Sequence, residues 1–293
     1  MCRLFGLSSA PHRIKAAFWL VEAPDSLSTQ SRANPDGTGV GVFTPDGTPV
    51  AYRQPVAAWE DRDFALEARD LESTTFVAHV RFASTGELTT ANTHPFQQDG
   101  RLFAHNGVIE GLDALEARLA ALGTDLAGLV HGQTDSERFF ALITTEIRRH
   151  HGDVTAGITA AATWVAANLP VFCLNLILTT PDGLWALRYP GTHELYLLER
   201  GPGGPGTATP LDHADSRSRV HARSSDLAQV PCVVVASERM DDDPGWRLLR
   251  AGELVRVDPG TAITSTVAVP QPPAHPLAVA DLHARAAASQ STH

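Results

Sequence analysis

The second residue of the chain is a cysteine, and a cysteine at this position suggests nucleophilic chemistry. The chain begins with Met1-Cys2, and a small residue at position 2 normally permits removal of the initiator methionine. Cys2 would then carry a thiol and a free α-amino group on one carbon framework. Because an α-amine has a pKa of ~7.7–8.0, it can accept the thiol proton near neutral pH. The alternative is a buried cysteine that begins the first strand.

A loop asparagine and a strand arginine are of the types that acyl transfer to a thiol needs. Such a reaction requires oxyanion donors and a grip on the substrate. Asn106-Gly107 follows the short strand 102–105 and offers a side-chain N–H and an approachable backbone N–H, although Asn-Gly is also an ordinary turn. Arg81 lies in the apolar strand 75–82, where its planar guanidinium suits either a substrate carboxylate or a structural salt bridge.

An aspartate belongs to a helix-capping pattern. Thr134 and Glu137 have the spacing of a capping box, which places Asp135 in the first turn of a helix. At this place Asp135 either stabilises the helix dipole or binds a substrate ammonium group.

Three histidines, His79, His94 and His105, lie close to these motifs. A histidine as the base of a cysteine mechanism is one alternative. We expect instead that the three side chains pack and form hydrogen bonds near the loops, with His94 held by the following Pro95.

Composition favours a soluble cytoplasmic protein. The 293 residues are 43% hydrophobic and carry a formal net charge of −10, which argues against a nucleic-acid-binding surface. The three cysteines form no C-x-x-C pattern, so we expect neither a disulfide framework nor a metal site, and Cys173 and Cys232 are assigned to the core. We predict no signal peptide and no membrane-spanning segment, and therefore a soluble cytoplasmic protein.

The order of the predicted elements indicates a mixed α+β domain with predominantly antiparallel sheets and helices outside them. Strands are predicted at 4–7, 40–43, 50–53, 75–82, 102–105 (stopped by Asn106-Gly107 and resumed at 108–109), 171–179, 184–189, 194–199, 231–236 and 253–257. Helices are predicted at 14–23, 60–72, 112–122, after 134 and at 154–168. We expect one domain over residues 2–269 and a weakly ordered tail, rich in Pro, Ala and His, over 270–293.

Several short motifs occur in a fixed order along the chain. They are Met1–Gly6, Asn34–Gly39, Ala78–Gly86, Thr93–Phe96, His105–Gly107 and Thr134–Glu137. Together they resemble the class II glutamine amidotransferase domain, a member of the N-terminal nucleophile hydrolases, over roughly residues 2–260. The later Val234–Glu238, Trp246 and Gly252-Glu253 are similar to the stand-alone branch of this family, which includes the γ-glutamyl hydrolase of ergothioneine biosynthesis.

The resemblance implies a four-layer αββα sandwich of antiparallel sheets and a role for each residue singled out above. Cys2 is the implied nucleophile, and Asn106 with the backbone N–H of Gly107 forms the implied oxyanion hole. Arg81 would bind the α-carboxylate of a glutamine or γ-glutamyl group, and Asp135 its α-ammonium group. No metal or organic cofactor is implied.

The resemblance also assigns Ser84 and Thr85 to substrate binding, because they stand in the loop that contacts the glutamine in relatives. The sequence departs from the family here, since relatives often have Thr-His in this loop and tryptophan at the positions of Phe82 and Thr38. These departures affect the expected shape of the pocket.

The predicted activity is hydrolysis of glutamine or of a γ-glutamyl amide, both small molecules, through a γ-glutamyl thioester on Cys2. One alternative is an amidotransferase subunit that passes ammonia to a separate synthase partner. Another is a hydrolase of the ergothioneine type, which needs no partner. A third is a non-catalytic γ-glutamyl-binding module. The residues predict no oligomeric state.

Overall fold

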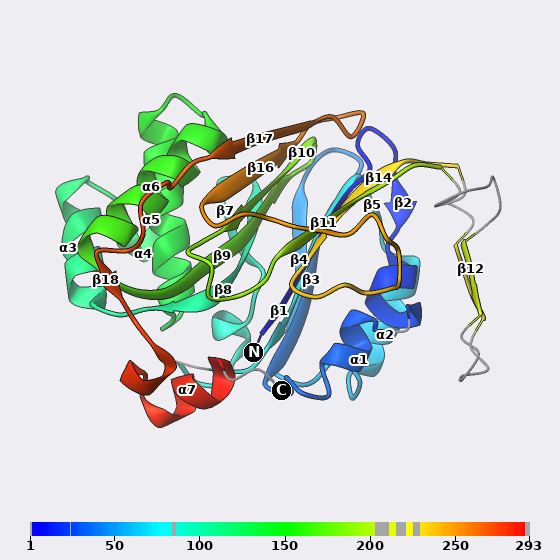
Figure 1. Cartoon of the computed structure of the whole chain (residues 1–293), viewed down its shortest axis with the longest axis horizontal. Helices are drawn as coiled ribbons and strands as arrows, with labels where there is room; N and C mark the ends of the chain where they lie inside the picture. Colours follow the sequence, from blue (N-terminus) through cyan, green and yellow to red (C-terminus); the bar gives the residue numbers. More distant parts are fainter. Residues whose placement is uncertain are drawn as a thin grey trace.

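Two antiparallel sheets stacked face to face form the centre of the computed structural model (Figure 1). The structure describes residues 2–23, 25–83, 86–202, 211–214, 221–224 and 229–290. Among these residues, neighbouring strands of both sheets run antiparallel, except for one short parallel pair formed by the C-terminal part of the chain.

The first sheet places the N-terminal strand at its centre. Its strand order is β15-β11-β14-β1-β6-β3-β4. The bounds are β1 (Arg3–Ser8), β3 (Gly37–Phe43), β4 (Pro49–Gln54), β6 (Thr75–Arg81), β11 (Tyr196–Arg200), β14 (Cys232–Ala236) and β15 (Arg247–Leu248). Arg3 of β1 lies opposite Val80 of β6, so the residue before β1, Cys2, lies beside the end of β6.

The second sheet has the order β17-β16-β10-β9-β8-β7, with β18 beside β9. Its strands are β7 (Phe96–Gln98), β8 (Arg101–Ile109), β9 (Pro170–Thr180), β10 (Gly183–Arg188), β16 (Glu253–Val257), β17 (Ile263–Val267) and β18 (His275–Pro276). Two ribbons pair β2 (Ile14–Lys15) with β5 (Glu72–Ser73) and β12 (Leu211–Ala214) with β13 (His221–Ser224). In the second sheet, Gly107 of β8 lies opposite Leu174 of β9.

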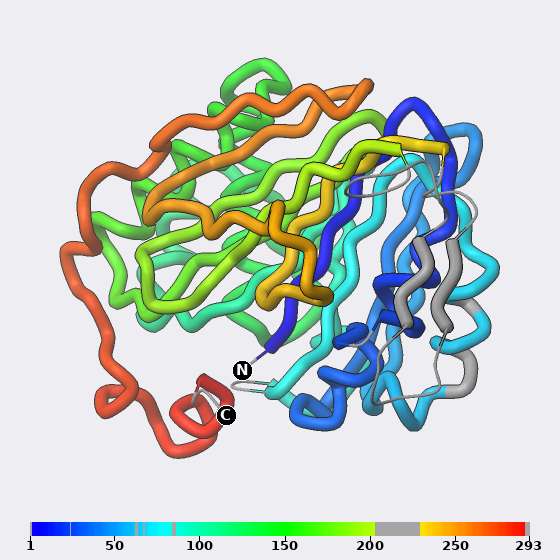
Figure 2. The backbone as a smooth tube through the Cα atoms, turned by 45° about the vertical axis from the view of Figure 1, so that its right-hand side comes forward, coloured from blue at the N-terminus to red at the C-terminus, as the bar shows by residue number. Residues whose placement is uncertain are grey.

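Helices cover the outer faces of both sheets (Figures 1 and 2). Those over the second sheet are α3 (Leu112–Ala121), α4 (Leu126–Leu129), α5 (Asp135–Arg149) and α6 (Val154–Asn168). Those over the first sheet are the π-helix η1 (Phe18–Glu22), α1 (Leu27–Gln30) and α2 (Arg62–Asp70), and the short 3-10 helix η2 (Thr90–Asn92) precedes β7. The four layers confirm the αββα sandwich.

In the described part of the chain, no helix has the length and apolar character needed to cross a bilayer.

Close packing between the sheets holds the N-terminal strand in place. The apolar side chains buried between them include Leu4, Val77, Leu102, Ile177, Leu184 and Val255. A Cβ at Gly6 would lie only 2.9 Å from Ile177 Cγ2 and from Leu184 Cδ1. Glycine at this position therefore lets β1 approach the second sheet more closely than any other residue would.

Local sequence signals predicted several elements well. The structure places α6 over the predicted range 154–168. Thr134 caps α5, because its hydroxyl accepts a hydrogen bond of 3.2 Å from the backbone N–H of Glu137. The helix predicted over 14–23 differs from the structure in its first part, since β2 pairs with β5 there and the π-helix begins only at Phe18.

The C-terminal part of the chain forms β18, η4 (Val279–Asp281) and α7 (Ala284–Gln290). Composition predicted weak order over 270–293, which stays a prediction, and the structure describes this segment up to residue 290. Leu282 and Ala286 are buried in an apolar cluster with residues of β8 and β9. This burial is a tertiary contribution to stability that composition cannot reveal.

We predict that Phe103→Ala lowers the free energy of unfolding by about 3–5 kcal/mol, because it leaves a cavity between the second sheet and its helices. Phe103 is fully buried in β8, and its ring stacks on that of Phe140 in α5 with centroids 4.6 Å apart. Leu66→Ala is the control, since Leu66 on α2 is 60% exposed and its truncation should cost less than about 0.5 kcal/mol. Urea denaturation measures both, and equal losses would contradict this packing.

Candidate active site

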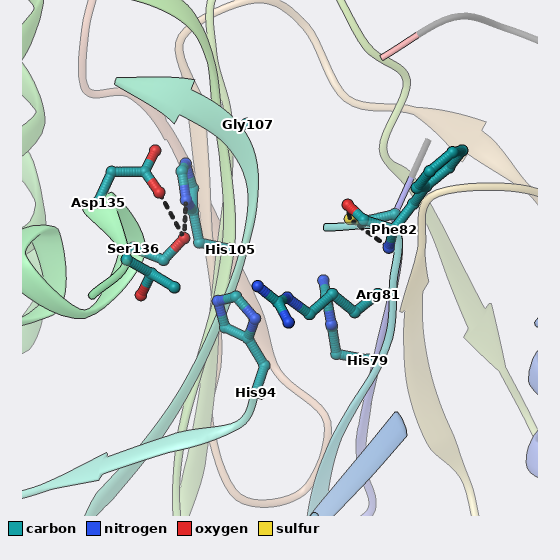
Figure 3. Close-up of a pocket in the computed structure, with 10 residues that line it drawn as sticks. His79, Arg81, Phe82, His94, His105, Gly107, Asp135 and Ser136 are labelled. Carbon is teal, nitrogen blue, oxygen red and sulfur yellow. Dashed lines mark hydrogen bonds between the residues drawn. The ribbon is translucent and has the colours of Figure 1, made fainter. Parts of the chain in front are cut away.

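The ends of β1 and β6, the middle of β8 and the start of α5 meet at a small, partly open cavity (Figure 3). The cavity volume is about 20 Å³, which is room for little more than one water molecule. Its lining consists of Cys2, His79, Arg81, Phe82, His94, His105, Gly107, Thr134, Asp135 and Ser136. Tertiary structure therefore brings Cys2, Arg81, Gly107 and Asp135, all predicted as site residues, to one cavity.

The Cys2 thiol is held by the backbone of Phe82. Its Sγ accepts a hydrogen bond from Phe82 N at 3.2 Å and can donate to Phe82 O at 3.3 Å. Burial raises the pKa of the thiol, although the Phe82 N–H and the positive charges of Arg81 and Arg3 oppose this shift. The thiol is therefore protonated at neutral pH, and attack by sulfur requires a base.

The Asn106-Gly107 pair lies directly beside the nucleophile. Asn106 does not line the cavity, but its Nδ2 donates a hydrogen bond of 2.9 Å to the carbonyl oxygen of Cys2. This bond uses one of the two amide hydrogens of Asn106, and the second amide hydrogen can still donate to another acceptor. A Cβ on Gly107 would lie 1.9 Å from the carbonyl oxygen of Cys173, so the pairing of β8 with β9 excludes any larger residue there.

A buried cation and a buried carboxylate occupy opposite sides of the cavity. Figure 3 shows Arg81 extending from β6 toward the side that carries Asp135. Arg81 donates to the carbonyl oxygen of Glu87 at 3.3 Å. Asp135 accepts a hydrogen bond of 2.9 Å from Ile109 N. Burial lowers the pKa of Arg81, while the negative charges of Asp36 and Asp135 raise it.

The three histidines all line this cavity. The expectation that they form hydrogen bonds holds for His105, whose Nδ1 lies 2.9 Å from Ser136 Oγ and whose Nε2 lies 3.3 Å from Cys173 O. His79 and His94 differ, because none of their ring nitrogens has a hydrogen-bond partner among the described residues. Burial lowers the pKa of His79 to about 3 and that of His94 well below its usual value, so both rings are neutral near pH 7.

Some site residues were not predicted from sequence. The backbone of Phe82 carries no sequence signal, because every residue has an N–H and a carbonyl group. One feature of the sequence could have pointed to Ser136 as a site residue: it follows Asp135 in the first turn of a capped helix. Ser84 and Thr85, which were predicted to bind substrate, lie outside the described residues. No group of three or more metal-ligating side chains occurs within the described ranges.

The antiparallel αββα sandwich with a cysteine just before its central strand is the architecture of the N-terminal nucleophile hydrolases. The family model for class II glutamine amidotransferases matches residues 1–280 of the chain. The chain therefore belongs to the class II glutamine amidotransferases, a family of enzymes.

Individual relatives are similar to this chain over different lengths. Glutamine–fructose-6-phosphate aminotransferase from Idiomarina loihiensis is 35% identical over 127 residues, which are 43% of this chain and 20% of that protein. The γ-glutamyl-hercynylcysteine sulfoxide hydrolase of Mycolicibacterium smegmatis is 28% identical over 268 residues, covering 88% of this chain and 96% of the hydrolase. A solved glutamine aminotransferase class-II domain protein from Silicibacter pomeroyi shares the fold, with a TM-score of 0.57 at 19% identity over 90% of this chain and 98% of that one.

The buried histidines predict a loss of stability in acid. Because the pKa of His79 is about 3 in the folded protein and ~6.5 in the unfolded chain, unfolding binds a proton between these values. The stabilisation is complete above pH 6.5 and decreases as the pH falls toward 3, by about 1.4 kcal/mol per pH unit for His79.

Urea denaturation between pH 6.5 and 5 tests this prediction. His79→Gln should reduce the slope of the free energy of unfolding against pH by about one proton, whatever its effect on stability at pH 7. His12→Gln, at an exposed position, is the control. An unchanged slope in His79→Gln would show that His79 is already protonated in the native state.

Proposed function

We propose that the chain hydrolyses glutamine or a γ-glutamyl amide through a γ-glutamyl thioester on Cys2. The observation that carries this proposal is the meeting of the Cys2 thiol, the Arg81 guanidinium, the Asp135 carboxylate and the Gly107 backbone at one cavity. Family membership supports the same chemistry.

The first half of the reaction forms the thioester. After Met1 is removed, the α-amine of Cys2 takes the thiol proton, and Sγ attacks the γ-carbonyl carbon of the substrate. The second amide hydrogen of Asn106 and the N–H of Gly107 donate to the oxyanion, and each such donor contributes about 2.7–4 kcal/mol to transition-state stabilisation in comparable sites. The C–N bond then breaks, and ammonia or an amine leaves with the proton held by the α-amine.

The second half of the reaction releases glutamate. Water, deprotonated by the α-amine, attacks the thioester carbon at the same oxyanion site. The C–S bond breaks and the thiol of Cys2 is restored. One water is consumed, and the products are glutamate and ammonia or an amine.

Arg81 and Asp135 suit the other end of the substrate. A γ-glutamyl group ends in an α-carboxylate and an α-ammonium group, which need a cation and an anion at a fixed separation. The buried Arg81 would bind the carboxylate through its planar guanidinium, and Asp135 would bind the ammonium group.

A hydrolase without a synthase partner is favoured over an ammonia-delivering subunit by one comparison. The hydrolase of M. smegmatis matches 88% of this chain over 96% of its own length, whereas the aminotransferase match covers only 20% of that enzyme. Assays of ammonia release from glutamine, with and without γ-glutamyl conjugates, separate the two functions. A synthase-dependent subunit would show little glutaminase activity alone.

We predict that Cys2→Ala lowers the rate of hydrolysis by at least roughly 10³-fold, because the covalent intermediate cannot form. A glutamine-like diazo-ketone should label Cys2 in the unaltered protein, as peptide mapping would show. Cys232→Ala should keep both activity and labelling, since Cys232 lies in the core of the first sheet. An active protein whose intact mass retains Met1 would exclude the mechanism.

We predict that Arg81→Lys raises KM and lowers kcat/KM roughly 10- to 100-fold, because an ammonium cannot reproduce the bidentate contact with a carboxylate. Arg149→Lys is the matched control, at a side chain on α5 that is 56% exposed. Steady-state kinetics with glutamine measure both variants. An unchanged KM in Arg81→Lys would place the α-carboxylate elsewhere.

A further inference from the structure

A second cavity lies at the edge of the first sheet, beside strands β3 and β4 and the start of α2. Its volume is about 60 Å³, which is room for several water molecules and therefore for the polar head of a small ligand. Thr38, Arg53, Asp61 and the buried Phe64 are among the residues that line it. Among the described residues, none that lines this cavity also lines the one beside Cys2, so the two cavities are distinct.

The hydroxyl of Thr38 is the feature that points to a ligand. Thr38 is only 1% exposed, and its Oγ1 has no hydrogen-bond partner among the residues that the structure describes. A buried hydroxyl without a partner costs free energy, because it has lost its bonds to water and gained none in exchange. A ligand with a polar group in this cavity would supply that partner.

Arg53 brings a positive charge to the same cavity. Its Nη1 donates to the carbonyl oxygen of Thr93 at 3.4 Å, which uses one of the five N–H donors of the guanidinium. Within the described ranges of the chain, Arg53 forms no ion pair. A half-buried guanidinium with further N–H donors is well suited to a carboxylate.

Asp61 brings the opposite charge. It directly precedes α2, and its Oδ1 accepts a hydrogen bond of 3.1 Å from Phe64 N, so it caps the helix while its carboxylate lines the cavity. The wall thus carries one cation and one anion, and a ligand that matches both must be a zwitterion.

The turn at Thr93-His94 lies between the two cavities. Arg53 bonds to Thr93, and a Cβ at Gly39 would lie 2.2 Å from the carbonyl oxygen of His94. The ring of His94 lines the cavity beside Cys2. A ligand bound at Arg53 is therefore separated from Cys2 by main chain, and it occupies a site of its own.

We propose that this cavity is a second binding site, for a free α-amino acid. The carboxylate of the ligand bonds to the guanidinium of Arg53 and the hydroxyl of Thr38, and its ammonium group bonds to the carboxylate of Asp61. A simple anion fits less well, because Asp61 would repel it. The site does not depend on hydrolysis at Cys2, and its test measures binding alone.

The test is an NMR titration of the protein with glycine. It is followed through the backbone N–H signals of Thr38 and Gln54, which lie opposite each other in β3 and β4 and line the cavity. These signals report on this site even where glycine also binds beside Cys2. The unaltered protein should bind glycine here, and it should bind acetate and methylammonium, which carry one charge each, at least roughly tenfold more weakly.

Three variants assign the two ends of the ligand. Arg53→Gln should weaken glycine binding roughly 10- to 100-fold, because a charge-assisted hydrogen bond is lost. Asp61→Asn should weaken glycine binding roughly tenfold without weakening acetate binding, and asparagine still caps α2. Arg81→Gln, in the cavity beside Cys2, should leave the Kd measured from these two signals unchanged.

Thr38→Val separates a ligand contact from a structural role. Valine keeps the shape of the side chain and removes the hydroxyl, so glycine binding should weaken roughly 3- to 10-fold. The free energy of unfolding without glycine, measured in urea, should not fall, because the hydroxyl has no partner to lose among the described residues.

The control and the contrary outcomes are as follows. Arg149→Gln, at an exposed side chain on α5, should bind glycine like the unaltered protein. The inference is overturned when glycine fails to shift the two signals, when Arg53→Gln leaves the Kd unchanged, or when acetate binds as tightly as glycine. A lower free energy of unfolding in Thr38→Val would show that its hydroxyl has a structural role instead.

Discussion

The two hydrogen bonds between the Cys2 thiol and the backbone of Phe82 are the contacts on which the rest of the site depends. They join residues 80 positions apart in the chain and exist only because β1 pairs with β6 in one register. A slip of one residue would turn Cys2 to the opposite face of the sheet. The close approach of β1 to the second sheet at Gly6 opposes such a slip.

Burial has consistent electrostatic effects around this cysteine. It raises the pKa of the thiol and lowers the pKa of both His79 and His94, so all three groups are uncharged near pH 7. The positive charge at the cavity is that of Arg81, and the facing carboxylate is Asp135. A site of this kind suits a zwitterionic ligand, because one cation and one anion are held apart in a region of low dielectric constant.

The family relationship concerns the shared sandwich, and individual relatives match this chain over very different shares of their own length. The match to one aminotransferase covers only 20% of that enzyme, whereas the match to one hydrolase covers 96% of its length. In this chain the helix α7 occupies the end of the sandwich beside the N-terminus, and its buried face packs against strands β8 and β9.

Local sequence signals were enough to predict α6 and the capped start of α5. Residue type and motif order led to the prediction that Cys2, Arg81, Gly107 and Asp135 are site residues. Tertiary structure alone decided the rest. It selected the backbone of Phe82 as the support of the thiol, left His79 and His94 without hydrogen-bond partners among the described residues, and packed the C-terminal segment against β8 and β9. These features depend on contacts between residues far apart in the chain, and neither composition nor local periodicity carries information about such contacts.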